Sequence, residues 1–312
     1  MQKNKSMQII HTVSELREAL TNQANIGQKP SQKIGFVPTM GNLHAGHIHL
    51  VDLAKQHASC VVVSIFVNPL QFSPTEDLSA YPRTLEADYE KLRTVGCDIV
   101  FVPSVTEVYP DFDGNNLNQS MMIDPPPIAN VLCGATRLKH FAGVATVVMK
   151  LFNLVFYNTA QPNIAVFGKK DFQQLFIIKE MVRQFNLPIE IIAGETMRET
   201  NGLALSSRNG YLSDAQRASA NQLNKALQSI VVKIKEGDSN FGQLEHAASK
   251  TLILQGWEVD YISIRSSATL QTATAQDKDL VVLGAAKIIN KTGGKTRLID
   301  NIEFCAKSLK RL

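Results

Sequence analysis

The sequence lacks the features of several large protein classes. Its 312 residues include only four cysteines, and no two of them form a C-x-x-C pair, so neither a zinc site nor a disulfide framework is expected. Reduced thiols in a cytoplasmic protein are the simple interpretation. The first twenty residues lack the apolar stretch of a signal peptide, and no segment is long and apolar enough to span a membrane. We therefore expect a cytoplasmic protein that does not enter the membrane.

Two common nucleotide-binding motifs are also missing. No G-x-G-x-x-G follows an expected strand, which disfavours a dinucleotide-dependent redox enzyme. Gly294-Lys295-Thr296 looks like the end of a P-loop, but Ile289 stands where that motif needs its first glycine. The net charge of +4 is too mild to indicate a nucleic-acid partner, although it suits anionic substrates.

What the sequence does contain, in its first two thirds, is an alternation of short apolar runs with helical patterns. Strands are expected at residues 33–38, 59–67, 98–102, 163–167 and 189–193, and helices at 45–57, 85–95, 144–155 and 171–185. Such alternation predicts an α/β fold with a parallel sheet covered on both faces.

The pattern changes after about residue 194. Ser213 with Gln216, and Asn240 with Gln243, are pairs typical of helix starts. The expected elements are helices at 214–236 and 241–256, then strands at 259–265, 280–289 and 296–301.

This change predicts two domains, residues 1–194 and residues 195–312, the second a smaller α+β domain. The hinge is expected between residues 192 and 197. Residues 111–127, which end in three prolines, are expected to be irregular, as a loop or a covering flap.

The segment PTMGNLHAGH (38–47) directly follows the first expected strand. Gly41 allows a turn and Gly46 allows close approach of a ligand to the backbone. His44 and His47 are three residues apart, so they share one face at a helix N-terminus, where backbone N–H groups favour anions. Imidazole donors there could hold the phosphates of a nucleotide, whereas a zinc site would need a further ligand that is not found at a usual spacing. Solvated loop histidines are the alternative.

Three further segments carry polar groups suited to phosphates or a small acid. Residues 205–208 (LSSR) offer two hydroxyls and a guanidinium, although they could form an ordinary polar loop. Residues 167–174 (FGKKDFQQ) bring lysines to the end of a strand, where parallel sheets bind ligands. Asp171 and Gln174 could equally form a capping box there. Gln71, after the turn that ends the second strand, is an uncharged donor suited to a carboxylate or a hydroxyl.

H-x-G-H resembles the HIGH signature of adenylate-forming nucleotidyltransferases. PTMGNLHAGH, IFVNPLQF, FGKKDFQQL, RETNGLALSSRNGYL, KHFAGVATVVMKLFNLV and RLIDNI together resemble the pantothenate synthetases (pantoate–β-alanine ligases) from about residue 9 onward. The resemblance implies a Rossmann-like domain with a smaller C-terminal lid, a homodimer, and ATP with Mg²⁺. In that family pantoate and ATP give pantoyl adenylate and pyrophosphate. β-Alanine then attacks the adenylate, giving pantothenate and AMP.

The resemblance also implies roles for individual residues. His47 is the proton donor, and His44 and Lys170 are the other catalytic residues. Gln71 and Gln174 bind pantoate, and Gln71 also lies where β-alanine arrives. The ATP site comprises Met40, Gly41, Asn42, Leu43, His44, Ala45, Gly46, His47, Gly168, Lys169, Lys170, Asp171, Met197, Leu205, Ser206, Ser207 and Arg208. No metal site made by side chains is expected.

The chain departs from the family pattern in several places. Lys169 stands where glutamate is usual, so it would make the phosphate pocket more positive or point to solvent. Residues 137–143 read RLKHFAG instead of RPGHFRG, and there is extra sequence at 111–118 and 156–160. Two other functions stay open: an H-x-G-H enzyme that transfers AMP to a phosphate acceptor, and a nucleotide-binding regulatory protein without turnover.

Overall fold

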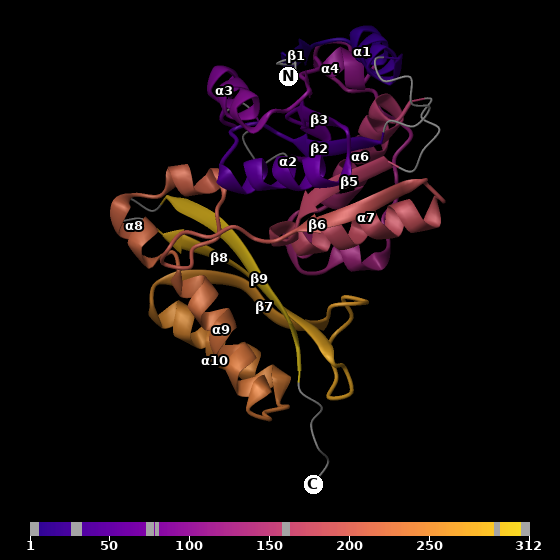
Figure 1. Cartoon of the computed structure of the whole chain (residues 1–312). Helices are drawn as coiled ribbons and strands as arrows, with labels where there is room; N and C mark the ends of the chain where they lie inside the picture. Colours follow the sequence, from indigo (N-terminus) through magenta and orange to yellow (C-terminus); the bar gives the residue numbers. More distant parts are fainter. Residues whose placement is uncertain are drawn as a thin grey trace. The chain divides into compact units, whose positions relative to one another are not determined.

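The chain folds into two compact units (Figure 1). The computed structural model describes residues 6–25, 33–72, 78, 81–157, 163–289 and 294–306. The first unit is Met1–Ala129, Arg137–Lys169 and Gln174–Glu195, and the second is Asn130–Thr136, Lys170–Gln173 and Thr196–Leu312. Within the described ranges no helix is long and apolar enough to cross a membrane.

The first unit is built on a parallel sheet of six strands in the order β1-β4-β3-β2-β5-β6. The strands are β1 (Gln8–Ile10), β2 (Ile34–Thr39), β3 (Cys60–Ile65), β4 (Ile99–Phe101), β5 (Asn163–Gly168) and β6 (Ile189–Gly194). The chain runs from β2 outward to β4 and then returns to β5 on the other side of β2. The strand order therefore reverses between β2 and β5, which confirms the predicted Rossmann-like α/β class.

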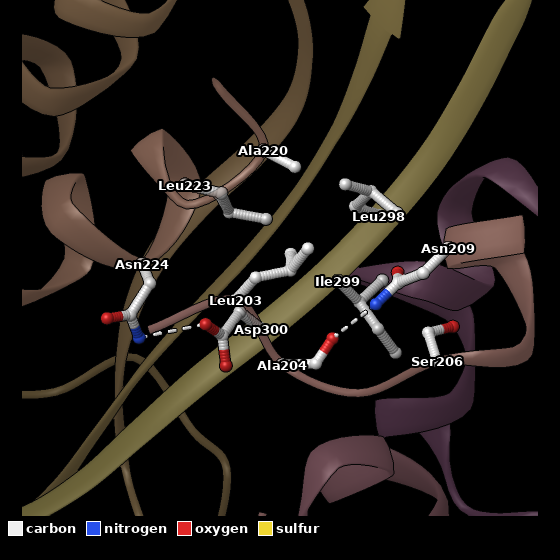
Figure 2. A pocket seen from close by; sticks show the side chains of 10 residues that line it. All are labelled: Leu203, Ala204, Ser206, Asn209, Ala220, Leu223, Asn224, Leu298, Ile299 and Asp300. Carbon is white, nitrogen blue, oxygen red and sulfur yellow. Dashed lines mark hydrogen bonds between the residues drawn. The ribbon is translucent and has the colours of Figure 1, made fainter. Parts of the chain in front are cut away.

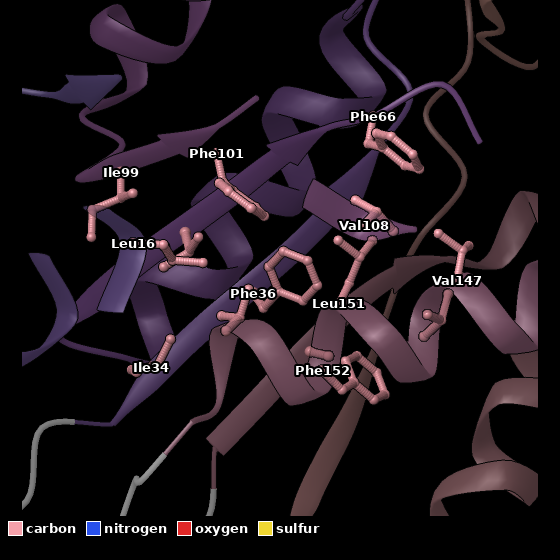
Figure 3. Close-up of a cluster of buried hydrophobic side chains, with 14 of the residues drawn as sticks. Leu16, Ile34, Phe36, Phe66, Ile99, Phe101, Val108, Val147, Leu151 and Phe152 are labelled. Atoms are coloured by element: carbon pink, nitrogen blue, oxygen red, sulfur yellow. The ribbon is translucent and has the colours of Figure 1, made fainter. Parts of the chain in front are cut away.

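Side chains alternate between the two faces of each strand, so the sheet contributes residues to two separate hydrophobic cores. In β3, Cys60 and Val62 face one core, while Val61, Val63 and Ile65 face the other. The core drawn in Figure 3 lies between the sheet and the helices α1 (Val13–Asn25), α6 (His140–Val155) and α7 (Phe172–Gln184). Helices α2 (Ala45–His57) and α3 (Leu85–Val95) cover the opposite face. Because both faces are covered, every position of β3 is buried, as its β-branched sequence predicts.

The second unit is an antiparallel sheet with helices. Its elements are β7 (Trp257–Ser266), β8 (Asp279–Ile289), β9 (Lys295–Cys305), α8 (Asp214–Ser219), α9 (Gln222–Lys235) and α10 (Phe241–Leu254). Side chains of α9 and α10 share one apolar core with alternate residues of the strands. The smaller α+β fold predicted for the C-terminal part is confirmed.

The single helix predicted over residues 214–236 is wrong, because it is broken into α8 and α9. At the break Ala220 is buried, and Asn221 donates from its side chain to the carbonyl of Asn201, 3.0 Å away. Ala220 and Asn221 both keep right-handed helical dihedral angles, so the helix is interrupted without a change of backbone region, beside this bond to Asn201. A periodicity argument could not detect it, since Asn201 lies far away in sequence.

Other predicted boundaries need smaller changes. Helix α6 begins at His140, one turn earlier than expected, and the 3₁₀ turn η3 (Lys169–Asp171) precedes α7. Residues 111–126 contain no helix or strand, as predicted. The remaining short elements are η1 (Pro69–Gln71), α4 (Val105–Val108), η2 (Pro127–Asn130), α5 (Cys133–Thr136) and η4 (Ser207–Tyr211).

The altered stretch 137–143 has a backbone consequence. Lys139 caps α6 with φ of 62°, a left-handed conformation that glycine adopts without cost and other residues rarely adopt. In the family stretch RPGHFRG this position is glycine. The chain thus keeps the glycine conformation with a lysine in it.

Substitutions at Lys139 should reveal this strain. We expect Lys139→Val to lower the free energy of unfolding by about 1 kcal/mol, because a β-branched residue resists positive φ. Lys139→Gly should leave it unchanged or raise it by less than about 1 kcal/mol. Urea unfolding of each variant measures this. At Lys233, exposed within α9, the order should reverse, with glycine the more costly substitution. The same order at both positions would contradict the interpretation.

Candidate active site

The candidate residues of the first unit begin at the reversal point of the sheet. In parallel sheets ligands bind outside the carboxyl ends of the strands where the order reverses. Here that position is formed by the ends of β2 and β5, at Thr39 and Gly168. The MGNLHAGH segment leaves β2 and the GKKD segment leaves β5, so both motifs start at this edge.

Asp88 of α3 holds the loop after β2 in place. Its carboxylate is fully buried and accepts hydrogen bonds from the backbone N–H groups of Asn42 and Leu43, both at 2.8 Å. The loop needs such support because Gly41 and Asn42 both have positive φ, 83° and 50°. Asp88 therefore fixes the path of the loop that leads into α2.

His44 and His47 form a reciprocal cap at the start of α2. Nδ1 of His44 accepts the N–H of Gly46 at 3.1 Å, and Nδ1 of His47 accepts the N–H of His44 at 3.2 Å. The ring centroids are 4.1 Å apart. Because each Nδ1 is an acceptor, each neutral ring carries its proton on Nε2. The pair thus caps the helix through both Nδ1 atoms, and the N–H donor of each neutral ring is its Nε2 group.

Gln71 lies at the end of η1, half-buried beside the same loop. Its Nε2 donates to Sδ of Met40, 2.9 Å away, and its Oε1 accepts from Nδ2 of Asn68 at 3.2 Å. The carbonyl of Gln71 accepts from Nδ1 of His140 at 2.8 Å, which leaves Nε2 of that neutral ring to accept from Arg137. The structure therefore brings Gln71 and Met40 together.

Gly143 lets α6 approach this segment closely. A β-carbon at position 143 would stand 2.3 Å from the carbonyl oxygen of Leu70 and 2.9 Å from the nitrogen of Gln71. Only glycine fits there without displacing the backbone that carries Gln71.

The end of β5 carries Gly168 and Lys169. Nζ of Lys169 lies 2.6 Å from Oε1 of Glu195, which follows β6. Its charge is thus offset by a carboxylate that the sequence interpretation did not consider.

The two adjacent glutamines of α7 have different environments. Gln173 is buried and bonds through its amide to the backbone of Cys133 and Val131. Gln174 is half-buried, and its side chain makes no hydrogen bond with any residue that the structure describes. The capping pair with Asp171 is therefore not formed among these residues, and Gln174 keeps its amide available.

In the second unit a tight turn joins Met197 to the LSSR segment. The N–H of Leu205 donates to the carbonyl of Met197 at 2.9 Å, and Arg198 pairs with Ala204 across the turn. Arg198 is clamped to the buried Asp300 of β9 by two hydrogen bonds of 2.7 and 2.9 Å. This bidentate pair fixes the turn.

The next residue of β9, Asn301, holds Lys170. Nδ2 of Asn301 donates to the carbonyl of Lys170 at 2.8 Å. Nζ of Lys170 is 3.9 Å from Asp171, a weak pair. Within the described residues the guanidinium of Arg208 makes no ion pair, so it can accept an anionic partner.

A small cavity lies beneath the LSSR segment in the second unit (Figure 2). It is lined by Leu203, Ala204, Ser206, Asn209, Ala220, Leu223, Asn224, Leu298, Ile299 and Asp300. Its volume is about 10 Å³, enough for about one water molecule and far too small for a nucleotide. It is a packing defect of this unit and not the substrate site.

The extra sequence at 111–118 folds into a local turn. Asp113 accepts from the N–H groups of Asn115 and Asn116, and Asn118 donates to Asp113 and to the carbonyl of Asp111. These bonds hold the pKa of Asp113 below its usual range. The other extra segment, 156–160, lies outside the described residues from position 158 on.

The structure thus sorts the candidate residues into two groups. The first unit contains Met40, Gly41, Asn42, Leu43, His44, Ala45, Gly46, His47, Gln71, Gly168, Lys169 and Gln174, and the second contains Lys170, Asp171, Met197, Leu205, Ser206, Ser207 and Arg208. The residues that hold them, chiefly Asp88 and Asp300, were not predicted. A signal for Asp88 exists: it occupies an apolar position of the helical stripe shared with Tyr89 and Leu92.

Removing one acceptor oxygen of Asp88 should loosen the loop. We expect Asp88→Asn to lower the free energy of unfolding by about 1–3 kcal/mol, because a buried N–H loses its acceptor. Hydrogen exchange of the Asn42 and Leu43 amides should accelerate more than the global change explains. Asp52→Asn, at an exposed position of α2, is the control and should alter neither. Unchanged exchange in Asp88→Asn would refute the assigned role.

The chain is similar to known proteins over nearly its whole length. The family model described as pantoate-beta-alanine ligase matches residues 8–303. The pantothenate synthetase of Methylobacillus flagellatus is 58% identical over 299 residues, 96% of this chain and 99% of the relative. That of Thiobacillus denitrificans is 53% identical over 298 residues, 95% and 97% of the two chains.

Solved structures are similar over the same length. The pantothenate synthetase of Thermus thermophilus has a TM-score of 0.82 at 38% identity and covers 95% of this chain and 99% of its own. The pantoate-beta-alanine ligase of Francisella tularensis, in complex with beta-gamma ATP and beta-alanine, has a TM-score of 0.69 at 35% identity, with 95% and 97% covered. The chain belongs to the pantoate–β-alanine ligase family.

Proposed function

We propose that this chain joins pantoate to β-alanine at the expense of ATP, through a pantoyl adenylate. The observation that carries the proposal is the capped histidine pair at the reversal point of the sheet, within a chain that belongs to this family. A carboxylate oxygen of pantoate attacks the α-phosphorus of ATP, and pyrophosphate leaves. The amine of β-alanine then attacks the acyl carbon, the bond from that carbon to the phosphate oxygen breaks, and AMP leaves.

The histidines and lysines supply charge stabilisation in the first step. Nε2–H of His44 and of His47 donate hydrogen bonds to phosphate oxygens, where negative charge develops, and the proton-donor role of His47 is this hydrogen bond, because a neutral imidazole keeps its proton. The ammonium of Lys170 neutralises the leaving pyrophosphate. Ser206, Ser207 and Arg208 bind phosphate oxygens, and the ATP contacts include the remaining residues of segments 40–47, 168–171, 197 and 205–208. Adenylation needs this positioning and neutralisation more than it needs a covalent nucleophile.

Gln71 and Gln174 hold pantoate. Both are half-buried amides at the first unit's candidate site, and the Gln174 side chain has no protein hydrogen bond among the described residues. An amide donor binds a carboxylate without adding a full positive charge. Gln71 also lies where β-alanine arrives.

Mg²⁺ enters with ATP as part of the substrate. Magnesium bound to a nucleotide keeps several waters and uses phosphate oxygens with one or two carboxylates. Such binding needs no cluster of protein ligands, and among the described residues no group of three or more histidine, cysteine, aspartate or glutamate side chains is placed to hold a metal. Asp171 is the carboxylate of the GKKD segment that could contribute.

The domain roles follow from the same assignment. Residues 1–194 bind ATP and pantoate, and residues 195–312 close as a lid that keeps water from the adenylate. We further propose a cytoplasmic homodimer, which light scattering after gel filtration tests.

The overall reaction can be tested with the purified protein. AMP should accumulate only when pantoate, β-alanine and ATP are all present, and omission of β-alanine should leave a single burst of pyrophosphate. With oxygen-18 in the pantoate carboxylate, label should appear in AMP, because the acyl–oxygen bond is the one that breaks. A stable adenylated product would indicate transfer to a phosphate acceptor, and ATP binding without AMP release would indicate a regulatory protein.

Substitutions can separate capping from catalysis at His47. In His47→Asn the amide oxygen replaces Nδ1 as the cap acceptor, while the Nε2 donor is lost. We expect His47→Asn, like His47→Ala and Lys170→Ala, to reduce adenylate formation about 100-fold or more with the fold retained. Rapid-quench detection of pyrophosphate measures this. The controls His57→Asn, at the far end of α2, and Lys179→Ala, exposed on α7, should form adenylate normally. Near-normal rates in the site variants would contradict the roles.

A further inference from the structure

The orientation of one buried amide near the candidate site is fully determined. Oδ1 of Asn68 accepts the backbone N–H of Leu70 at 3.3 Å, and Nδ2 of Asn68 donates to the backbone carbonyl of Gly143 at 3.2 Å. A backbone N–H can only donate and a carbonyl can only accept, so the amide cannot be flipped. Asn68 is 1% exposed, so no water can replace these partners at low cost.

The fixed orientation of the Asn68 amide also fixes the orientation of the Gln71 amide. The second hydrogen of Asn68 Nδ2 points to Oε1 of Gln71 at 3.2 Å, which makes that oxygen the acceptor. Nε2 of Gln71 is therefore the donor end of the amide, and its partner among the described residues is Sδ of Met40. Sulfur is a weak hydrogen-bond acceptor, so a carboxylate or hydroxyl oxygen of a substrate would form a stronger hydrogen bond with Nε2 in its place. Gln71 is thus held as a donor.

Tyr109 completes the set of bonds around Asn68. Its hydroxyl donates to Oδ1 of Asn68 at 2.6 Å, and together the four bonds use both hydrogens and both acceptor sites of that amide. The side chain is fully buried, and burial raises the pKa of Tyr109 well above its usual value, so the hydroxyl keeps its proton and stays a donor. The ring packs 6.2 Å from that of Phe66, with Nζ of Lys150 5.2 Å from its centroid.

The hydroxyl is not needed for packing. A phenylalanine would fill the same space without burying a polar group, which is costly unless it is bonded. The bond to Asn68 is the one hydrogen bond of this hydroxyl among the residues that the structure describes. The bond therefore acts on the side-chain amide of Asn68, which orients the amide of Gln71.

We propose that Tyr109 is a positioning residue for pantoate, acting through Asn68 to hold the Gln71 amide with its Nε2 donor toward the substrate. The proposal rests on the pantoate-binding role proposed for Gln71. Tyr109 itself touches no substrate. Its removal should therefore affect pantoate binding selectively.

Tyr109→Phe is the direct test, because it removes one oxygen and keeps the ring. We expect KM for pantoate to rise about fivefold, the effect of losing one neutral hydrogen bond, with KM for ATP unchanged and kcat within about twofold. Calorimetric binding of pantoate should weaken by a similar factor. Tyr89→Phe, which alters a buried tyrosine of α3 in the other core of the same unit, is the matched control and should change neither KM. Thermal unfolding verifies that each variant is folded.

A double-mutant cycle tests the route through Gln71. In a Gln71→Ala background, which itself should raise KM for pantoate, Tyr109→Phe should add no further change. The same fivefold rise in that background, an equal rise of KM for ATP, or no change in Tyr109→Phe alone would overturn the proposal. If Gln71→Ala leaves KM for pantoate unchanged, the role of Gln71 fails first, and the inference fails with it.

Discussion

The two hydrogen bonds from the loop after β2 to the carboxylate of Asp88 are the interaction on which the rest of the first unit's site depends. They anchor a loop with two residues at positive φ, and the loop ends directly at His44. The direction in which α2 leaves the sheet and the positions of both capping histidines follow from it. A buried carboxylate suits this task because each of its two oxygens accepts one of the two backbone donors, and hydrogen bonds to a charged acceptor are stronger than those to a neutral one.

The same principle operates in the second unit with different elements. Asp300 holds the turn that joins Met197 to Leu205 through Arg198, and its neighbour Asn301 holds the backbone of Lys170. In each unit a buried polar side chain from a regular element fixes an irregular segment that carries candidate residues. Residues on rigid helices and strands thus hold these loops in defined positions, which the short-range contacts of the loops alone would not fix.

The sequence was sufficient for what depends on local pattern. Strands β2 to β6 of the parallel sheet, the bounds of α2 and α3 and the H-x-G-H start of a helix follow from apolar periodicity and from glycine and capping residues, whereas the edge strand β1 was not predicted. The sequence failed where residues distant in sequence meet, as at the break between α8 and α9, where Asn221 bonds to Asn201. The link from Tyr109 to Asn68 is equally beyond a periodicity argument, because it joins the end of α4 to the loop after β3. Lys169 shows the same limit for charge, since its partner Glu195 is brought beside it only by the pairing of β5 with β6.

The choice of an oriented amide at position 71 has a chemical reason under the proposed mechanism. The carboxylate of pantoate must be bound firmly and must still attack phosphorus, and a cation paired with it would stabilise the ground state and reduce its nucleophilicity. Interactions accelerate a step only when they are stronger in the transition state than before it. An amide donor binds the carboxylate more weakly than a cation, so its orientation has to be fixed by its surroundings and cannot be left to the ligand. In the proposed mechanism the cations Lys170 and Arg208 act instead on the phosphate groups, where negative charge grows during the reaction. The chemistry of adenylation therefore favours neutral donors that bind the nucleophile and charged donors that bind the leaving group.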